Sequence, residues 1–438
     1  MKTGKTSRSM QLIGLAAKLG RSELSQTIKD KLSQGIDQVT SGRLGTRIEQ
    51  ARMIAENLSQ MKGAAMKAGQ LLSLDAADFL PPEAVDLLTK LQGQADPLPW
   101  TTMREVLESE LGLDRLADFS GLDPNAAASA SIGQVHRAKL AGKDVAIKIQ
   151  YPGVAESIDS DLAMLKTIAK SGLMLSGRKM NLDEAFDELS LVLHQEADYE
   201  NELKNMQEYS RFLEDSDDFV VPQGIESHST KRVLAMSWED GLPLADWLKT
   251  NPSRESRERI GRLIMDLYYK EFYEWGFVQT DPNYANFLIR ERRDMPVQLV
   301  VLDFGAALRY TEEFRRDYKT LVRTVVEGDR QETLDALVRF QLIDQRESRE
   351  VIDKLINVVR LGLEPFEKSR QPFRFSDADY SRRNREALLT FTQSLKYSPP
   401  PRRLIFLHRK LGGVFAFLKR LNVEIDLTPY WVRLSASW

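Results

Sequence analysis

The chain of 438 residues contains no cysteine. This absence excludes disulfides, thiolate zinc sites and cysteine nucleophiles. Histidine is scarce too, and the four histidines lie far apart without forming a spaced pair of metal ligands. A histidine-rich metal centre is therefore not expected. The four are His136, His194, His228 and His408.

Neither charge nor apolar sequence is concentrated anywhere in the chain. Lys and Arg number 61 against 64 Asp and Glu, which gives a net charge of −3. Nucleic-acid binding needs a basic face, so this balance argues against it. No apolar run approaches the roughly 18–20 residues of a spanning helix. The best run, residues 411–418, has eight residues including two glycines, so we expect a soluble or peripheral protein.

Periodicity predicts an α+β fold. Apolar residues recur with a helical period over residues 47–74, and the texture changes after Pro124 to two short strands at 132–140 and 144–150. Further expected elements are helices at 101–111, 154–172 and 183–213, strands at 220–222, 232–236 and 297–302, and a hinge at 239–243. The expected domains are a variable basic N-terminal segment at 1–46, a helical extension at 47–118, a small lobe at 119–241 and a helical lobe at 242–438.

The first 22 residues carry five basic side chains and no acidic one. An apolar stretch at residues 10–17 lies between them. Three interpretations stay open, namely a frayed basic terminus, a helix on a membrane surface and an organellar address.

Three motifs carry chemistry, and each has a bland alternative. Lys148 ends an apolar strand, where an exposed lysine is common. Asp281 and Asn286 are five residues apart on a predicted loop, which suits a base beside a metal-ligating amide but also an Asx-rich turn. Asp303 follows a buried strand and precedes Phe-Gly, where it can approach Mg²⁺ or simply begin a turn.

The serial order of these motifs is that of the protein-kinase fold. It predicts an ATP site in which Lys148 neutralises phosphates and Asn286 and Asp303 bind Mg²⁺. Asp281 would accept or orient the proton of an acceptor. Electrostatic positioning of this kind supplies most of the catalysis of phosphoryl transfer.

The departures from protein kinases are as informative. No Gly-x-Gly-x-x-Gly precedes Lys148, and an alanine-rich segment at residues 126–134 stands in its place. Alanine amides have less conformational freedom than glycine amides. No Ala-Pro-Glu follows Asp303, and we expect a helix to begin at Arg315, so a long platform for peptide substrates cannot fit.

Further motifs give the chain a family resemblance. Lys67-Ala68-Gly69-Gln70 lies on the long predicted helix, and Glu196-Ala197-Asp198 is followed by Tyr199 and Glu202. With the alanine-rich segment, which Ser129 interrupts, and the segments 150–154, 279–283 and 407–413, the chain resembles the UbiB/AarF/ADCK family of atypical kinases linked to ubiquinone biosynthesis. The resemblance extends from about residue 47 to the C-terminus.

The resemblance implies a set of site residues. The catalytic set is Asp281, Lys148, Lys67, Glu196, Asp198 and Glu202. The cofactor contacts are Ala128, Ser129, Ala130, Ser131, Ile132, Gly133, Gln134, Lys148, Met236 and Trp238, and the metal ligands are Asn286 and Asp303. If 183–213 is one helix, Glu196 and Asp198 lie on different faces, which favours Glu202 as the partner of Lys148 and Glu196 as that of Lys67. Lys67 and Gln70 would restrain the site.

The resemblance also implies an atypical protein-kinase-like two-lobe fold with an N-terminal helical extension. It implies a kinase or ATPase that uses ATP or ADP with Mg²⁺ and supports ubiquinone or related isoprenoid-lipid biosynthesis without phosphorylating proteins in trans. A nucleotide-dependent, non-catalytic scaffold is the alternative, and a small-molecule kinase is the third. Expected partners are a lipid or quinone precursor, a membrane surface and ubiquinone-biosynthesis enzymes, with homodimerisation left open. The expected location is the cytoplasm or inner-membrane periphery of a bacterium, or the matrix side of a mitochondrion.

Overall fold

The computed structural model describes residues 97–438 except 131, 164–165, 167–181, 282, 341, 345, 395–401 and 437–438. The predictions for the basic terminus, the long helix and Lys67 lie outside the described residues, as does Ser131. The chain divides into two compact units. The first contains the described residues up to Lys204 and Gly224–Trp238, and the second contains Asn205–Gln223 and Glu239–Trp438. The four-domain division stays a prediction.

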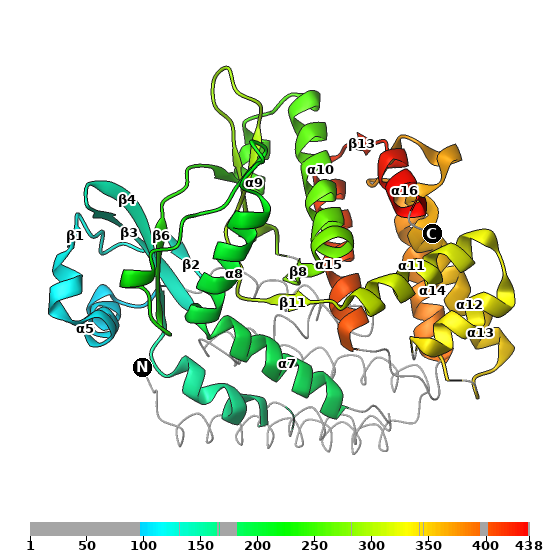
Figure 1. Ribbon diagram of the computed structural model, residues 1–438, viewed down its shortest axis with the longest axis horizontal. Helices are drawn as coiled ribbons and strands as arrows, with labels where there is room; N and C mark the ends of the chain where they lie inside the picture. Colours follow the sequence, from blue (N-terminus) through cyan, green and yellow to red (C-terminus); the bar gives the residue numbers. More distant parts are fainter. Residues whose placement is uncertain are drawn as a thin grey trace, which may run out of the picture. The chain divides into compact units, whose positions relative to one another are not determined.

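The first unit is built on an antiparallel sheet (Figure 1). The turn at residues 141–142 has positive φ at both positions, 49° and 81°, as a two-residue hairpin requires. The predicted pair of strands is confirmed. Residues 145–150 are all buried because the strand that carries them is central and covered on both faces. The strand order is β1 (Phe119–Ser120), β3 (Gly133–Leu140), β4 (Lys143–Gln150) and β6 (Val233–Ser237), and β2 (Ala128–Ser129) also pairs with β3.

Helix α5 (Trp100–Ala117) packs against this sheet and confirms the helix predicted at 101–111. It runs further than predicted because the chain continues helically after a kink at Gly112, where φ is 73°. The buried residues recur at the spacing of one helix face. They are Met103, Val106, Leu107 and Leu111.

The single helix predicted over 183–213 is wrong. Two helices, α7 (Leu182–Glu196) and α8 (Tyr199–Phe212), are separated at residues 197–198. Asp198 stabilises this break, because its carboxylate accepts a hydrogen bond of 3.0 Å from the Asn201 amide at the start of α8. The rotation angle that we took between Glu196 and Asp198 on one helix therefore does not apply. Upstream, residues 154–163 are helical, as predicted.

The described residues of the second unit form three small sheets. The largest has the order β5 (Phe219–Val220), β10 (Gln298–Val301), β9 (Phe287–Arg290) and β7 (Leu242–Pro243). Two-stranded sheets are formed by β8 (Phe277–Gln279) with β11 (Ala307–Arg309) and by β12 (Phe373–Arg374) with β13 (Glu424–Ile425). The predicted strand at 297–302 corresponds to β10.

Helices make up most of the second unit, and α10 and α15 run side by side in it (Figure 1). The predicted start at Arg315 is three residues late, because Thr311 caps α11 through the Phe314 amide. No described helix is both long and apolar enough to cross a bilayer. The helices are α9 (Leu244–Lys249), α10 (Arg254–Tyr269), α11 (Glu312–Glu327), α12 (Arg330–Arg339), α13 (Arg349–Leu363), α14 (Ala378–Ser394), α15 (Arg402–Leu421) and α16 (Thr428–Ser435).

A π-helix, η2 (Lys270–Trp275), continues α10 and ends at Gly276. Gly276 has a φ of 65°, and a Cβ there would lie 2.8 Å from the Tyr310 carbonyl oxygen. Only glycine fits this position without strain. The next three residues form β8, so the π-helix sets where the strand begins.

Candidate functional site

Lys148 forms a buried ion pair in the first unit. Its Nζ lies 2.8 Å from both carboxylate oxygens of Glu202 in α8. The two side chains are 10% and 1% exposed. The ring of Tyr199, 4.9 Å from Nζ, adds a cation–π contact. The pairing that we expected from the sequence is present, and it holds the lysine extended from the sheet.

The register of the sheet gives Lys148 an apolar surrounding. Val135 is opposite Lys148, and Met236 is opposite Ala146, so these four side chains share one face of the sheet. Such a face suits a flat heterocycle beside the phosphate-binding lysine. Met236 was predicted; Val135 and Ala146 were missed, although strand alternation around Lys148 could have identified them.

Trp238 follows β6 and is held from two sides. Its backbone amide donates a 3.1 Å hydrogen bond to the Asp144 carbonyl, and the Arg137 guanidinium lies 4.7 Å from its ring centre. Its ring therefore packs against an arginine on the same sheet.

The alanine-rich segment is a hairpin rather than an open phosphate loop. β2 pairs with β3, and the amides of Ala127 and Ala130 donate 2.8 Å hydrogen bonds to the carbonyls of Val135 and Gly133. Both amides are therefore used within the hairpin. Ala128 and Ser129 form β2 itself. Ile132 is buried, and its carbonyl accepts from the Tyr151 amide at 2.8 Å.

Two residues of the predicted cofactor set, Gly133 and Gln134, have structural roles. At Gly133 a Cβ would lie 2.5 Å from the Ile149 carbonyl oxygen and 2.7 Å from the Tyr199 hydroxyl, so close packing requires glycine. The Gln134 amide side chain bonds the backbone of Leu98 before α5, with Oε1 accepting at 2.8 Å. Its Nε2 donates to the His136 ring at 2.9 Å.

His136 is fully buried between these groups. Gln134 donates to Nε2, so Nδ1 carries the proton and donates to the Asp123 carbonyl at 2.8 Å. Burial lowers the pKa of His136, and the ring is neutral. His136 thus belongs to the packing between α5 and the sheet.

The second unit brings together Asp281, Asn286 and Asp303. Asn286 lies in a short 3-10 turn, and its Nδ2 donates to the Asp281 carboxylate at 3.2 Å. The Leu302 amide donates to the Asn286 carbonyl at 2.9 Å, which brings the end of β10 beside the start of β9. The Gly305 amide donates to Oδ1 of Asp303 at 3.0 Å and fixes the carboxylate plane.

Two buried side-chain amides hold the backbone around Asp303. Gln279 Nε2 donates to the Asp303 carbonyl, and Asn205 Nδ2 donates to the Phe304 carbonyl at 2.8 Å. Both amides are buried. From the sequence, Gln279 was named only as the start of the segment 279–283, and Asn205 was missed. Asn205 and Phe304 are so distant in sequence that no local spacing could have indicated their contact.

The donor set fits magnesium. Because Nδ2 of Asn286 bonds Asp281, the amide presents Oδ1 as the other end, and Asp303 adds carboxylate oxygens. Mg²⁺ binds through one or two such oxygens and keeps several waters. No cluster of three His, Asp or Glu side chains with metal-binding geometry occurs in the described part of the chain. Asn286 and Asp303 would therefore hold the ion with help from phosphate oxygens.

Glu196 and Asp198 occupy the break between α7 and α8. Glu196, the last residue of α7, is 9% exposed, whereas Asp198 caps α8. The expected partner of Glu196, Lys67, lies outside the described residues. The structure therefore gives Asp198 a helix-capping contact.

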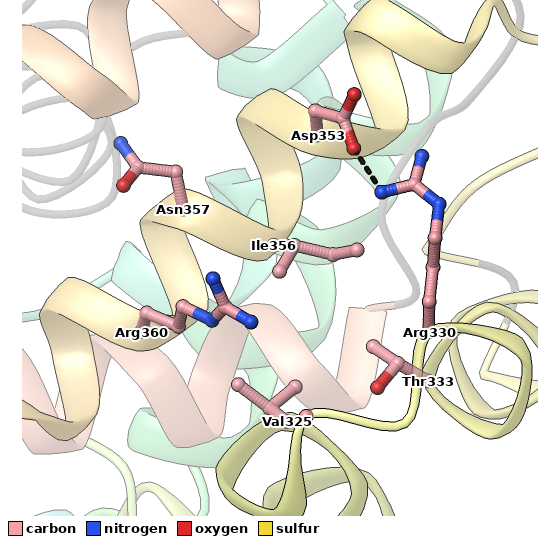
Figure 2. A pocket seen from close by; sticks show the side chains of 8 residues that line it. Val325, Arg330, Thr333, Asp353, Ile356, Asn357 and Arg360 are labelled. Carbon is pink, nitrogen blue, oxygen red and sulfur yellow. Dashed lines mark hydrogen bonds and ion pairs between the residues drawn. The ribbon is translucent and has the colours of Figure 1, made fainter.

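A hollow of about 280 Å³ lies among α11, α12 and α13 (Figure 2). Thr333 and Ile356 form part of its buried floor, and the Arg330–Asp353 ion pair and Arg360 form its charged rim. None of the predicted site residues lines it. The motif residues, rather than this hollow, define the candidate site.

Comparisons with known proteins give the family. Residues 90–337 match the model of the ABC1 atypical kinase-like domain. The chain belongs to this family. It is 30% identical to the probable serine/threonine-protein kinase abkA of Dictyostelium discoideum, over 97% of this chain and 78% of that protein. It is 33% identical to the mitochondrial atypical kinase COQ8B of Rattus norvegicus, over 96% of this chain and 78% of that protein.

A solved structure agrees with the fold. The Mycobacterium tuberculosis protein Rv3197, in complex with erythromycin, matches with a TM-score of 0.60 and 25% identity, over 91% of this chain and 98% of that one. The predicted family, the kinase-like fold and the assignment to atypical kinases are therefore confirmed. Nucleotide binding follows from membership of this family.

Proposed function

We propose that the chain binds magnesium ATP and transfers or hydrolyses its γ-phosphate in support of ubiquinone, or related isoprenoid-lipid, biosynthesis. The observation that carries the proposal is the joint placement of Asp281, Asn286 and Asp303, linked by the Asn286–Asp281 and Leu302–Asn286 hydrogen bonds. A fold alone would not require a carboxylate, an amide and a second carboxylate at one loop end.

Each residue has a role that follows from its charge and position. When bound, Mg²⁺ neutralises charge on the phosphate oxygens. Asn286 and Asp303 would hold it through oxygen atoms. Lys148, kept extended by Glu202, would bind phosphate oxygens. Val135, Ala146 and Met236 would contact the adenine ring. We propose Asp281 as the group that accepts or orients the proton of the attacking hydroxyl or water.

Protein phosphorylation in trans is disfavoured by the segment after Asp303. Only residues 304–311 separate it from α11, which begins at Glu312. Residues 307–309 of this segment are used in β11, paired to β8. Little chain is left to bind an extended peptide, which supports a small-molecule acceptor or water.

The lipid-biosynthetic role rests on the relatives. Several are named COQ8-type atypical kinases, among them one from rat and one, 33% identical, from Saccharomyces cerevisiae. With the sequence resemblance, these names support ubiquinone biosynthesis as the process served. We propose a lipid or quinone precursor, a membrane surface and biosynthetic enzymes as partners, at the inner-membrane periphery of a bacterium or the matrix side of a mitochondrion.

Calorimetry of ATP binding tests the nucleotide half of this proposal. Asp303→Asn should abolish the Mg²⁺-dependent part of ATP affinity while the far-ultraviolet circular dichroism stays unchanged. Equal affinities for magnesium ATP in the variant and the wild type would contradict the assignment.

Phosphate release, measured with and without lipid vesicles and quinone-like phenols, separates catalysis from scaffolding. Turnover that requires Asp281 supports an enzyme; binding without turnover under every condition supports the non-catalytic scaffold. Deletion of the gene followed by measurement of cellular quinones tests the lipid-biosynthetic role.

A further inference from the structure

A row of buried polar side chains lies in the second unit and ends at the backbone of Asp303. It contains Tyr209 from α8, Glu271 from the π-helix, Lys410 from α15 and Gln279 from β8. Their exposed fractions are 0%, 0%, 4% and 1%. Four polar groups from four separate elements meet in the interior of the unit, where buried polar groups need partners from the protein itself.

The contacts connect the row from end to end. Lys410 Nζ lies 2.9 Å from Oε2 and 3.2 Å from Oε1 of Glu271, and it donates to Gln279 Oε1 at 3.3 Å. The Tyr209 hydroxyl donates to Glu271 Oε1 at 3.0 Å. At the far end, Gln279 Nε2 donates to the Asp303 carbonyl. One amide therefore bridges the ammonium and the backbone of Asp303.

The chemistry of lysine determines which way this amide points. An ammonium only donates, so the atom of Gln279 that faces it must be Oε1. The NH₂ group is then directed to the Asp303 carbonyl, which only accepts. Without Lys410 the two ends of the amide have nearly the same shape, and the flipped orientation would set Oε1 against the carbonyl.

Stability alone is a poor reason for such a row. Buried ion pairs can often be replaced by apolar side chains of similar volume without loss of stability, because desolvation offsets the attraction. Burial also raises the pKa of Glu271 despite the nearby lysine. What an apolar replacement cannot supply is the directional hold on Gln279.

We propose that Lys410 is a positioning residue for Asp303. Its ammonium, anchored by Glu271, orients the Gln279 amide, which fixes the Asp303 backbone while the Gly305 amide fixes the carboxylate. The inference rests on the proposed function in one respect, namely that Asp303 binds the metal of the metal–nucleotide complex.

The test measures metal binding separately from nucleotide binding and from turnover. Mn²⁺, detected by electron paramagnetic resonance, is titrated into protein saturated with ADP, and ADP affinity is measured separately in EDTA. Lys410→Met should raise the Mn²⁺ dissociation constant by roughly 10–100-fold, as is usual for the partners of metal ligands. ADP affinity in EDTA should stay unchanged, whereas a merely structural effect would weaken both.

Two further variants protect the test from misfolding and locate the effect. Lys410→Met with Glu271→Leu removes both buried charges and should fold, while showing the same loss of Mn²⁺ affinity. Gln279→Met should reproduce the loss, and adding Lys410→Met to it should change nothing more, because coupled residues are not additive. Wild-type Mn²⁺ affinity in the folded double variant, or full additivity with Gln279→Met, would overturn the proposal.

Arg383→Met is the matched control. Arg383 donates to both oxygens of the buried Glu364, at 2.6 and 2.7 Å, and neither residue has a described bond to Gln279 or Asp303. Its Mn²⁺ affinity should equal that of the wild type, and an equal loss there would assign the effect to general loosening of the unit. If the wild type itself binds no Mn²⁺ with ADP while Asp303→Asn behaves identically, the proposed function fails first.

Discussion

The two units each contain a buried lysine–glutamate pair, and the pairs differ in what surrounds them. Lys148 and Glu202 are joined by two contacts of 2.8 Å, and Lys148 stands among apolar side chains of a sheet face. Lys410 and Glu271 belong to a row that continues through Gln279 to a backbone carbonyl. The first pair stands beside an apolar sheet face, whereas the second continues into further polar groups of the protein interior.

This difference shows why burial of a charge does not by itself reveal its role. Both pairs carry a similar desolvation cost. The surroundings decide the matter: a lysine beside an apolar sheet face stands where a flat heterocycle and its phosphates can bind. A lysine whose donors are taken by a carboxylate and an amide acts on the chain.

The largest effect is expected when the second ion pair, Lys410–Glu271, is broken. Lys410→Met leaves Glu271 buried without its cation, so the free energy of unfolding should fall by roughly 3–5 kcal/mol. Urea unfolding followed by tryptophan fluorescence measures it. Lys410→Met with Glu271→Leu should recover most of the loss, and a double variant as unstable as the single one would show that the ion pair itself stabilises the unit.

The next effect falls on chemistry. Lys148→Met should lower single-turnover phosphate release by about 10²–10³-fold, because a preorganised cation is lost from the developing charge. Lys148→Arg keeps the charge but not the compact geometry and serves as the comparison. Phosphate release at the wild-type rate by Lys148→Met would remove the distinction between the two pairs.

A smaller effect concerns the packing beside the first pair. Gly133→Ala places a Cβ against the Ile149 carbonyl and the Tyr199 hydroxyl, so it should destabilise by about 1–3 kcal/mol. The control is Gly412→Ala in α15, where nothing lies within 4 Å of the added Cβ. This change should be neutral or stabilise by up to about 1 kcal/mol. Thermal unfolding of both variants measures the contrast, which equal shifts would contradict.

The smallest effect is a pH dependence of stability that comes from His136, which lies on the face of the same sheet opposite to Lys148. Burial lowers the pKa of His136, so protons bind the unfolded state more readily and stability falls as pH drops below about 6.5. One such group contributes at most about 1.4 kcal/mol per pH unit. His136→Gln should reduce the slope of the unfolding free energy between pH 6.5 and 5, and the slope from His408, whose pKa burial lowers to about 4, should remain. An unchanged slope would mean that His136 takes up its proton equally in both states.

Much of the candidate site could be predicted because its motifs are local. Asp281 and Asn286 are five residues apart, and an apolar run predicts the strand before Asp303. These two features depend on a few consecutive residues, so their spacing already determines their geometry. Lys148 and Glu202 lie far apart in sequence, and their pairing was expected from the family resemblance and from a single helix over 183–213 that the structure does not contain.

The rest could not be predicted, for physical reasons that differ by residue. The helical period continues past Glu196, so nothing in it announces that Asp198 would start a new helix by capping it. The alanine hairpin depends on pairing with β3, which single-residue preferences do not specify. Lys410 meets Gln279 across 131 positions and Glu271 across 139, and contacts so distant in sequence leave no periodic trace.

The π-helix at residues 270–275 has a consequence for how this chain tolerates changes in length. A π-turn holds more residues per turn than an α-turn, so losing one residue at 272–275 would let the segment relax to a regular α-helix. Because the π-turn already accommodates the extra residue, the residues before and after such a deletion would keep their angular relation, and Glu271 and Gln279 would still face the same ammonium. In α10, by contrast, each lost residue would turn the following residues by about 100°. A deletion of one residue should therefore be accepted more readily in this segment than in α10.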